Sequence, residues 1–387
     1  MTIGEALRER RERFGLSCAE VARIANLATA AVEAAEADAP GLTIADVEAL
    51  GRALVFDPAM LLRGEPLPDA RRLAGWFRSH TGDDERAIAP SDVRLFALAA
   101  ELGEIGAFLA ARCNRRFLPL DRLAPASLPP LDHDQAGRQG YAIAVESRRR
   151  LAELDTALPE HAPLTSIQAV LEQFGVHVAR VSLQATSKYA VTVARPGAMP
   201  VVLLNAAQDR VAHPLSRRAV LAHELAHLLL DSGERDLPPT DRTVADRELA
   251  VEQRANGFAP AFIAPPAQLG LPEHLEPERA ILRIAAQWGF TVEGAIWHAK
   301  NCGVVDDMRA QKLIHDPDFR SRAGTEARAE ARKKVWEPEG DYRDPRDLGL
   351  DVETSALAGG LIEALVLQAW ELGHISAGRV SEILTYA

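Results

Sequence analysis

The sequence predicts a mainly α protein with a small β-sheet, in the α+β class. Most segments carry apolar residues at helical spacing, and only three short stretches between residues 176 and 205 have the pattern of strands. With 387 residues, of which 47% are hydrophobic and 26% charged, the chain is long enough for two or more domains that each bury a core.

Composition and charge exclude several classes of protein. The formal net charge of −11 argues against a general binder of polyanions, although a local basic patch is compatible with it. The three cysteines Cys18, Cys113 and Cys302 are far apart and predict neither a disulfide framework nor a cysteine zinc site. The chain begins without the apolar run of a signal peptide, and glutamates interrupt its most apolar stretches, 95–111 and 357–370. We therefore expect a cytoplasmic protein without membrane contact.

The first 64 residues predict a bundle of five short helices. Ser17 followed by Glu20, and Thr43 followed by Asp46, have the spacing of capping boxes that begin two of them. Residues 91–112 then predict a long amphipathic helix that bridges two domains or makes a dimer contact, so a homodimer is one expectation. The proline-rich stretch 118–131 predicts a linker.

The rest of the chain predicts a second domain and a C-terminal extension. Helices are expected at 135–156, 166–174, 248–259, 276–289 and 292–302, and the end of the chain, 356–386, is expected to be helical with a break at 373–376. Strands that form a small sheet are expected at 176–181, 189–194 and 201–205. Pro260 predicts that the helix around residue 252 bends or ends early. The charged stretch 316–350, with its prolines and glycines, predicts an exposed connector.

The sequence Leu221–Leu230 contains the pattern His-Glu-x-x-His. On a helix, His223 and His227 lie four residues apart on one face, where both imidazoles reach one metal ion. Glu224 projects beside that face and could take a proton from a water that the metal activates. The flanking residues are apolar nearly all round, which predicts a buried helix whose polar side chains need partners. The pattern is typical of zinc peptidases.

The N-terminal segment resembles the XRE family of phage-repressor-like helix-turn-helix domains over residues 1–64. The resemblance rests on Leu16-Ser17, Glu20-Val21-Ala22, a turn at Asn26, and Val32 with Glu36. It implies a recognition helix at 28–36, in which Thr29 is the one uncharged polar side chain for reading bases. Seven arginines, ten acidic residues and no lysine give this segment a net charge of −3, a poor match to phosphates. Dimerisation or partner binding is therefore the favoured role, with DNA binding as the alternative.

Residues 135–315 resemble the ImmA/IrrE family of intracellular metallopeptidases. The resemblance rests on Gly175-Val-His-Val, Val201-Val-Leu-Leu-Asn205, Arg217-Arg218, the His-Glu-x-x-His helix, and Glu252-x-x-Ala-Asn-x-Phe-Ala259. In the family the glutamate of this last motif is the third zinc ligand, which implies that Glu252 completes a His, His, Glu set for Zn²⁺. Glu248, one turn earlier on the same helix face, is an alternative ligand.

These observations predict a helix-turn-helix bundle followed by a zincin-like metallopeptidase domain. The expected domains are 1–64 (helix-turn-helix), 65–131 (connector and linker), 132–315 (metallopeptidase) and 316–387 (charged connector and C-terminal helices). The expected activity is a cytosolic zinc endopeptidase in which Glu224 is the general base, and Tyr189 and His298 are candidates for stabilising the transition state.

The resemblance implies that the substrate is a repressor-like helix-turn-helix regulator, cleaved in a stress or mobile-element response. Two alternatives stay open. One is a DNA-binding transcription regulator whose zinc domain senses or scaffolds, and the other is an antitoxin-like protein that binds a partner without cleaving it.

Overall fold

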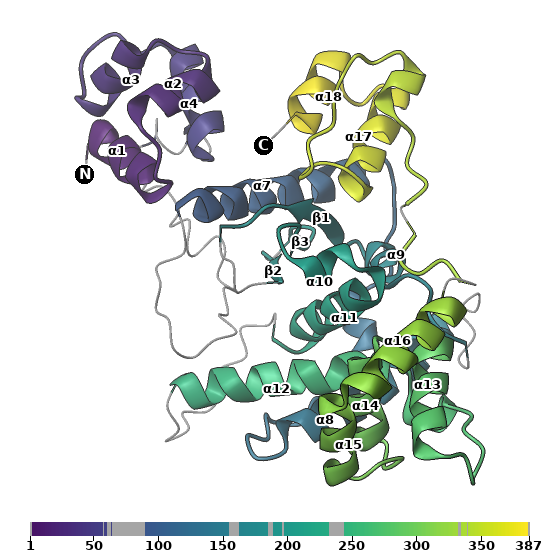
Figure 1. The fold of residues 1–387 in the computed structure, drawn as a ribbon. Helices are drawn as coiled ribbons and strands as arrows, with labels where there is room; N and C mark the ends of the chain where they lie inside the picture. Colours follow the sequence, from purple (N-terminus) through teal and green to yellow (C-terminus); the bar gives the residue numbers. More distant parts are fainter. Residues whose placement is uncertain are drawn as a thin grey trace. The chain divides into compact units, whose positions relative to one another are not determined.

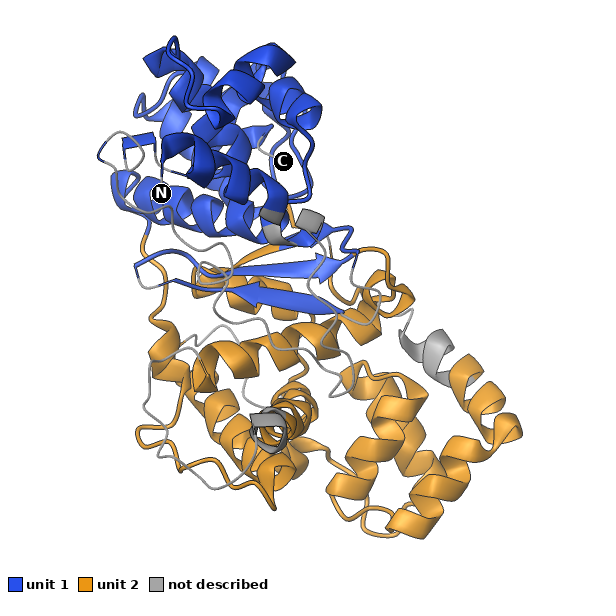
Figure 2. Ribbon diagram, turned by 90° about the vertical axis from the view of Figure 1, so that its left-hand side faces the viewer, with its two compact units in different colours: residues 1–115, 179–205, 342–387 blue, residues 116–178, 206–341 orange. Residues whose placement is uncertain are grey.

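The computed structural model describes residues 2–56, 58–59, 63, 90–154, 162–184, 189–195, 197–231, 244–331, 334–338 and 340–385. Two compact units are distinguished by colour in Figure 2. Unit 1 comprises residues 1–115, 179–205 and 342–387, and unit 2 comprises residues 116–178 and 206–341. The predicted α+β class, mainly helical with a small sheet, is confirmed. The predicted linear domain bounds stay a prediction, since this grouping by contacts combines segments that are distant in sequence.

Four short helices begin unit 1: α1 (Ile3–Arg13), α2 (Cys18–Ala25), α3 (Thr29–Glu36) and α4 (Ile44–Leu54). Both predicted capping boxes are confirmed, because Ser17 and Thr43 each accept a hydrogen bond from the backbone N–H three residues later. Leu7, Phe14 and Leu50 are each 1% exposed and form part of the core of this bundle. The predicted fifth helix falls largely outside the described residues.

The rest of unit 1 consists of a long helix, a small sheet and the C-terminal helices (Figure 1). They are α7 (Pro90–Arg112), β1 (His177–Val181, whose first two residues belong to unit 2), β2 (Ala190–Val193), β3 (Val201–Asn205), the short 3-10 helix η3 (Pro345–Leu348), α17 (Leu361–Glu371) and α18 (Ala377–Leu384). The strands have the order β1-β3-β2, and β2 pairs antiparallel with β3, with Val191 opposite Leu203. All five residues of β3 are buried, as expected for a central strand. The three predicted strands and the predicted sheet are therefore confirmed.

Unit 2 is helical. Its elements are η1 (Leu120–Leu123), α8 (Ala136–Leu154), α9 (Ile167–Gln173), α10 (Asp209–Ala212), α11 (Pro214–Leu230), α12 (Val244–Ile263), η2 (Pro266–Gln268), α13 (Pro277–Trp288), α14 (Val292–Asn301), α15 (Asp307–His315) and α16 (Pro317–Ala331). The stretch predicted as a linker is partly packed, because Leu123 in η1 is 0% exposed. Among the described residues, no helix is long and apolar enough to cross a membrane.

Helices α8 and α12 pack closely because glycines face each other at their crossing. A Cβ atom on Gly140 of α8 would lie 1.9 Å from the carbonyl oxygen of Arg254 in α12. A Cβ on Gly257 of α12 would lie 2.0 Å from the carbonyl oxygen of Gly137. No larger side chain fits at Gly140 or Gly257 without moving a backbone, so these glycines set the position of α12 against α8.

Of the two effects predicted for Pro260, an early end of the helix is wrong, and a bend stays a prediction. Helix α12 continues through Pro260 to Ile263, and the N–H of Ala264 donates to the carbonyl of Pro260 at 2.9 Å. Proline removes one helical N–H donor, but the residues after it still donate to the preceding turn. The last turn is also held by burial, since Ala261 and Phe262 are 0% exposed.

The segment 316–350, predicted as an exposed connector, contains a helix and several buried side chains. Residues Pro317–Ala331 form α16, which packs on α13 and buries Phe319 and Ala323, four residues apart. Beyond α16, Glu337 is 3% exposed and accepts a hydrogen bond from the N–H of Gln168 at 3.2 Å, at the start of α9. Trp336 is 6% exposed and stacks on the guanidinium of Arg218 at 4.2 Å. These few buried side chains anchor the segment, while most of its other described residues are exposed.

Candidate metal centre

Helix α11 carries the two histidines of the predicted site. The helix begins at Pro214, a residue suited to the first helical position, and runs to Leu230. Leu221, Ala222, Leu225 and Ala226 are all 0% exposed, so the helix is buried around most of its circumference, as predicted. The His223 and His227 rings meet edge to face, with centroids 4.7 Å apart. The local sequence thus places two imidazoles on one buried face.

Helix α12 brings Glu252 to these histidines. The Oε2 atom of Glu252 lies 3.2 Å from Nε2 of His223, and its Oε1 lies 3.5 Å from Nε2 of His227. The two Nε2 atoms are 3.0 Å apart. One ligand atom from each of the three residues lies within 4.8 Å of the others. We call these three residues the metal triad.

The donor set of the metal triad suits zinc. Two imidazole nitrogens and one carboxylate are a known set for catalytic zinc, which leaves a fourth position for water. Two ligands at about 2.0 Å from a tetrahedral ion are about 3.3 Å apart, close to the separations found here. His223 is 7% exposed and Glu252 is also 7% exposed, so the site is largely shielded from solvent. These residues fit a divalent metal ion as they stand.

The two histidines differ in protonation when no metal is bound. Burial lowers the pKa of His223, although its hydrogen bond to Glu252 acts in the opposite direction. Burial would also lower the pKa of His227, but the hydrogen bonds to Asp231 and Glu252 outweigh it and raise this pKa to about 10. The carboxylates around His227 thus favour its charged form, whereas burial favours the neutral form of His223.

Two further residues of the centre were missed by sequence reasoning. Asp231, directly after α11, lies 2.8 Å from Nδ1 of His227 through its Oδ2 atom. Arg254 on α12 donates through Nη2 to the other oxygen of Asp231 at 2.6 Å. The spacing of four residues between His227 and Asp231 was the available signal, because it places both on one helix face. No pattern in the sequence around Arg254 indicated that this residue contacts Asp231.

Glu224, the predicted general base, is buried on α11 and 5% exposed. Its negative charge contributes to raising the pKa of both His223 and His227, as expected for a carboxylate close to the two rings. Glu224 therefore lies close enough to His223 and His227 for its charge to shift the pKa of both rings.

Of the two predicted transition-state stabilisers, His298 is enclosed in unit 2 and Tyr189 lies in unit 1. His298 on α14 is 0% exposed, shares a hydrogen bond with the hydroxyl of Tyr141, and stacks on Phe290 with centroids 5.2 Å apart. Its ring lacks exposed surface for a substrate. Tyr189 is half-buried beside β2, and its carbonyl accepts a hydrogen bond from the N–H of Asn205 at 2.8 Å. Their catalytic roles stay predictions.

Glu248 and Thr29 complete the set of predicted site residues. Glu248 lies in α12, as expected, but its side chain is outside the described residues, and the metal triad contains Glu252. Thr29 is the first residue of α3 and is exposed, as is Glu33 on the same helix.

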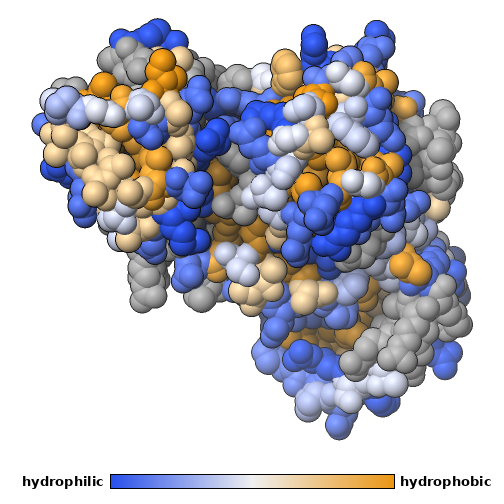
Figure 3. All heavy atoms as spheres, turned by 90° about the horizontal axis from the view of Figure 1, so that it is seen from above, coloured by the Kyte–Doolittle hydropathy of each residue, from blue (hydrophilic) through white to orange (hydrophobic). Residues whose placement is uncertain are grey.

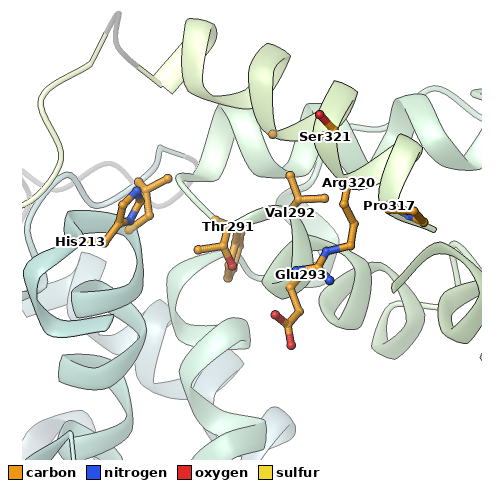
Figure 4. A pocket seen from close by; sticks show the side chains of 10 residues that line it. His213, Thr291, Val292, Glu293, Pro317, Arg320 and Ser321 are labelled. Atoms are coloured by element: carbon orange, nitrogen blue, oxygen red, sulfur yellow. The ribbon is translucent and has the colours of Figure 1, made fainter. Parts of the chain in front are cut away.

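A separate pocket of about 480 Å³ lies elsewhere in unit 2 (Figure 4). It opens between the start of α11, the start of α14 and α16, and its labelled side chains include His213, Thr291, Glu293 and Arg320. The lining contains no member of the metal triad. Sequence reasoning missed this pocket because one of its walls is α16, which was expected to be an exposed connector.

One family model of known proteins matches part of the chain. Residues 171–295 match the family model of the IrrE N-terminal-like domain, Peptidase_M78. Comparison with curated proteins and with solved structures gave no match. The matched segment includes α11 and α12 with the whole metal triad. This part of the chain is therefore similar to the IrrE N-terminal-like metallopeptidase domain.

Proposed function

We propose that the protein is a zinc-dependent endopeptidase with Zn²⁺ held by His223, His227 and Glu252. The observation that supports this most is the approach of three buried ligand atoms, from two helices, to within 4.8 Å of one another. A similarity to a metallopeptidase family over the same residues adds to it. A catalytic site needs these ligands to be preorganised, and burial of α11 and α12 provides that.

The reaction would be hydrolysis of a peptide bond. Zinc, when bound, would polarise the scissile carbonyl and lower the pKa of a water molecule from about 15.7 toward 7. Glu224 would accept one proton from this water as its oxygen bonds to the carbonyl carbon. Glu224 would then give the proton to the leaving nitrogen as the C–N bond breaks, so that one water is consumed and a carboxylate and an amine are released.

The proposed substrate is a repressor-like helix-turn-helix regulator, cleaved in the cytoplasm during a stress or mobile-element response. The similarity to the IrrE N-terminal-like domain supports this choice. In this proposal the α1–α4 bundle recruits the substrate or a second copy of the chain. Its acidic balance, seven arginines against ten acidic residues and no lysine over residues 1–64, supports a contact with protein over one with phosphates.

The variant Glu224→Gln tests this function. It should bind zinc as the wild type does and lose at least about 100-fold in cleavage rate, because glutamine keeps the shape but accepts no proton. The measurement is electrophoresis of a purified repressor-like helix-turn-helix regulator after incubation with zinc-loaded protein. Glu278→Gln, at a half-exposed site paired with Arg309, is the matched control and should cleave normally. An intact regulator with the wild type, or cleavage by the Glu224→Gln variant at the wild-type rate, would refute the proposal.

A further inference from the structure

The carboxylate of Asp231 joins the two helices that carry the metal triad. One of its oxygens lies 2.8 Å from Nδ1 of His227, and the other accepts from Nη2 of Arg254 at 2.6 Å. The backbone N–H of Asp231 also donates to the carbonyl of His227 at 2.9 Å. Asp231 belongs to the end of α11, and Arg254 follows Glu252 by two residues on α12. We call Asp231 and Arg254 the brace.

The brace has a chemical consequence for His227. When a carboxylate accepts the Nδ1 proton of an imidazole, the lone pair of the neutral ring is left on Nε2. In His227 this Nε2 is the atom that lies 3.0 Å from Nε2 of His223 and 3.5 Å from Glu252. The hydrogen bond to Asp231 thus directs the ligand atom of His227 into the metal triad.

The brace also has a geometric consequence. Its side chains are largely shielded from solvent, with exposed fractions of 6% for Asp231 and 8% for Arg254. A charged hydrogen bond in such surroundings resists rotation of both side chains more than an exposed pair does. Asp231 contacts the ligand His227 on α11, and Arg254 lies two residues after the ligand Glu252 on α12. The pair therefore fixes the positions of the two ligands relative to each other.

We propose that Asp231 and Arg254 are positioning residues that orient His227 and hold α11 and α12 at the separation that binds a metal ion. This inference rests on the metal triad of the proposed function. A merely structural ion pair between two helices would stabilise the fold equally well but would leave the intrinsic affinity for zinc unchanged. Affinity for the metal alone, without any peptide substrate, therefore separates the two roles.

The test measures zinc binding by competition with a chromogenic chelator in the full chain at pH 7.5. Asp231→Ala should weaken zinc affinity by about 10- to 100-fold, the usual effect of removing a group that orients a metal-bound histidine. Asp231→Asn, which keeps an acceptor for Nδ1 but loses the charge, should fall between this variant and the wild type. The visible spectrum of bound Co²⁺, which reports ligand geometry, should change in Asp231→Ala.

The double variant Asp231→Ala with Arg254→Met shows whether the two residues act together. Asp231→Ala alone leaves the Arg254 guanidinium buried without this carboxylate and is the variant most at risk of misfolding. The double variant removes both charges and should bind zinc no more weakly than Asp231→Ala, because Arg254 acts through Asp231. Weaker zinc binding by the double variant than by Asp231→Ala would contradict the proposal.

Glu337→Gln is the control for a structural role. Glu337 is 3% exposed, lies 3.9 Å from Nε of Arg218, and is not part of the metal triad. The variant should lower the melting temperature and keep wild-type zinc affinity.

Wild-type zinc affinity in both Asp231→Ala and the double variant would overturn the inference and leave the proposed function standing. Failure of the wild type itself to bind zinc would overturn both, and zinc binding without cleavage would count only against the proposed function.

Discussion

His223, His227 and His298 show how surroundings decide the chemistry of one residue type. Burial lowers the pKa of His223, and carboxylates raise that of His227 to about 10. Among the described residues no carboxylate shifts the pKa of His298, and burial lowers it to about 4 despite a backbone hydrogen bond that opposes this. The first two are poised to hold a metal ion, whereas His298 is a neutral member of the core.

His298 should make the protein less stable in mild acid. Its pKa is about 4 in the folded protein and about 6.5 in the unfolded chain, so between these values mainly the unfolded chain binds the proton. The stability is fully present above pH 6.5 and falls by about 3 kcal/mol as the pH decreases toward 4. Denaturant unfolding at several pH values should show that His298→Gln loses this part of the slope. An equal slope in variant and wild type would contradict the assignment.

At the scale of helices, the approach of α8 to α12 decides where Glu252 lies. Glycines at the crossing allow the two backbones to come within contact distance. Gly137 and Gly140 lie on the same helix, yet a Cβ on Gly137 would meet only the carbonyl oxygen of Gln253 at 3.6 Å, whereas one on Gly140 would meet that of Arg254 at 1.9 Å. Alanine substitutions at Gly137 and Gly140 can therefore be compared as a matched pair.

Gly140→Ala should destabilise the protein by about 1–3 kcal/mol, and Gly137→Ala should be neutral or slightly stabilising. The larger group at 140 must push α12 away, and with it Glu252, so zinc affinity should fall in this variant alone. Denaturant unfolding and zinc titration of both variants measure the two effects. Equal behaviour of the two alanine variants would show that the crossing does not set the position of α12.

At the scale of the whole chain, the metal triad lies within unit 2, and unit 1 contributes no member to it. The chain has a net charge of −11, and its N-terminal 64 residues share the acidic balance. On the face seen in Figure 3, apolar residues are interspersed with hydrophilic ones. Two large exposed apolar side chains are far apart in sequence: Ile44 (69%) begins α4, and Leu372 (55%) directly follows α17.

Zinc should protect unit 2 more than unit 1. A ligand that binds only the folded state stabilises it by about 2.7 kcal/mol at a hundred times its dissociation constant. Because the ligands come from α11 and α12, hydrogen exchange should slow most in these two helices on addition of zinc. A chelator should reverse the effect. Equal protection in α1–α4 would contradict a metal site confined to unit 2.

The α1–α4 bundle should bind DNA weakly. Affinity for DNA depends largely on phosphate contacts, and α3 presents the exposed residues Thr29 and Glu33, the second of which repels phosphate. A mobility-shift titration with the promoter of this gene at 150 mM salt should give a dissociation constant in the micromolar range or weaker. Sequence-specific nanomolar binding would contradict this and favour the DNA-binding regulator.

The sequence alone determined the parts of the site that depend on local spacing. The spacing of four from His223 to His227 places both on one helix face, and capping residues set where α2 and α4 begin. Glu252 was reached only through a family resemblance. The geometry that joins it to the histidines depends on glycines in α8 and α12, which are more than 100 residues apart.

Only the tertiary structure decided the position of α16, Trp336 and the brace. The segment after residue 316 has the composition of an exposed connector, yet Phe319 and Ala323 are buried against α13, and Trp336 packs on Arg218. Arg254 reaches Asp231 across 23 residues. Such contacts form between elements that are distant along the chain, and local propensity carries little information about them. The helix with its two histidines follows from its own sequence, and the completed metal site follows from packing.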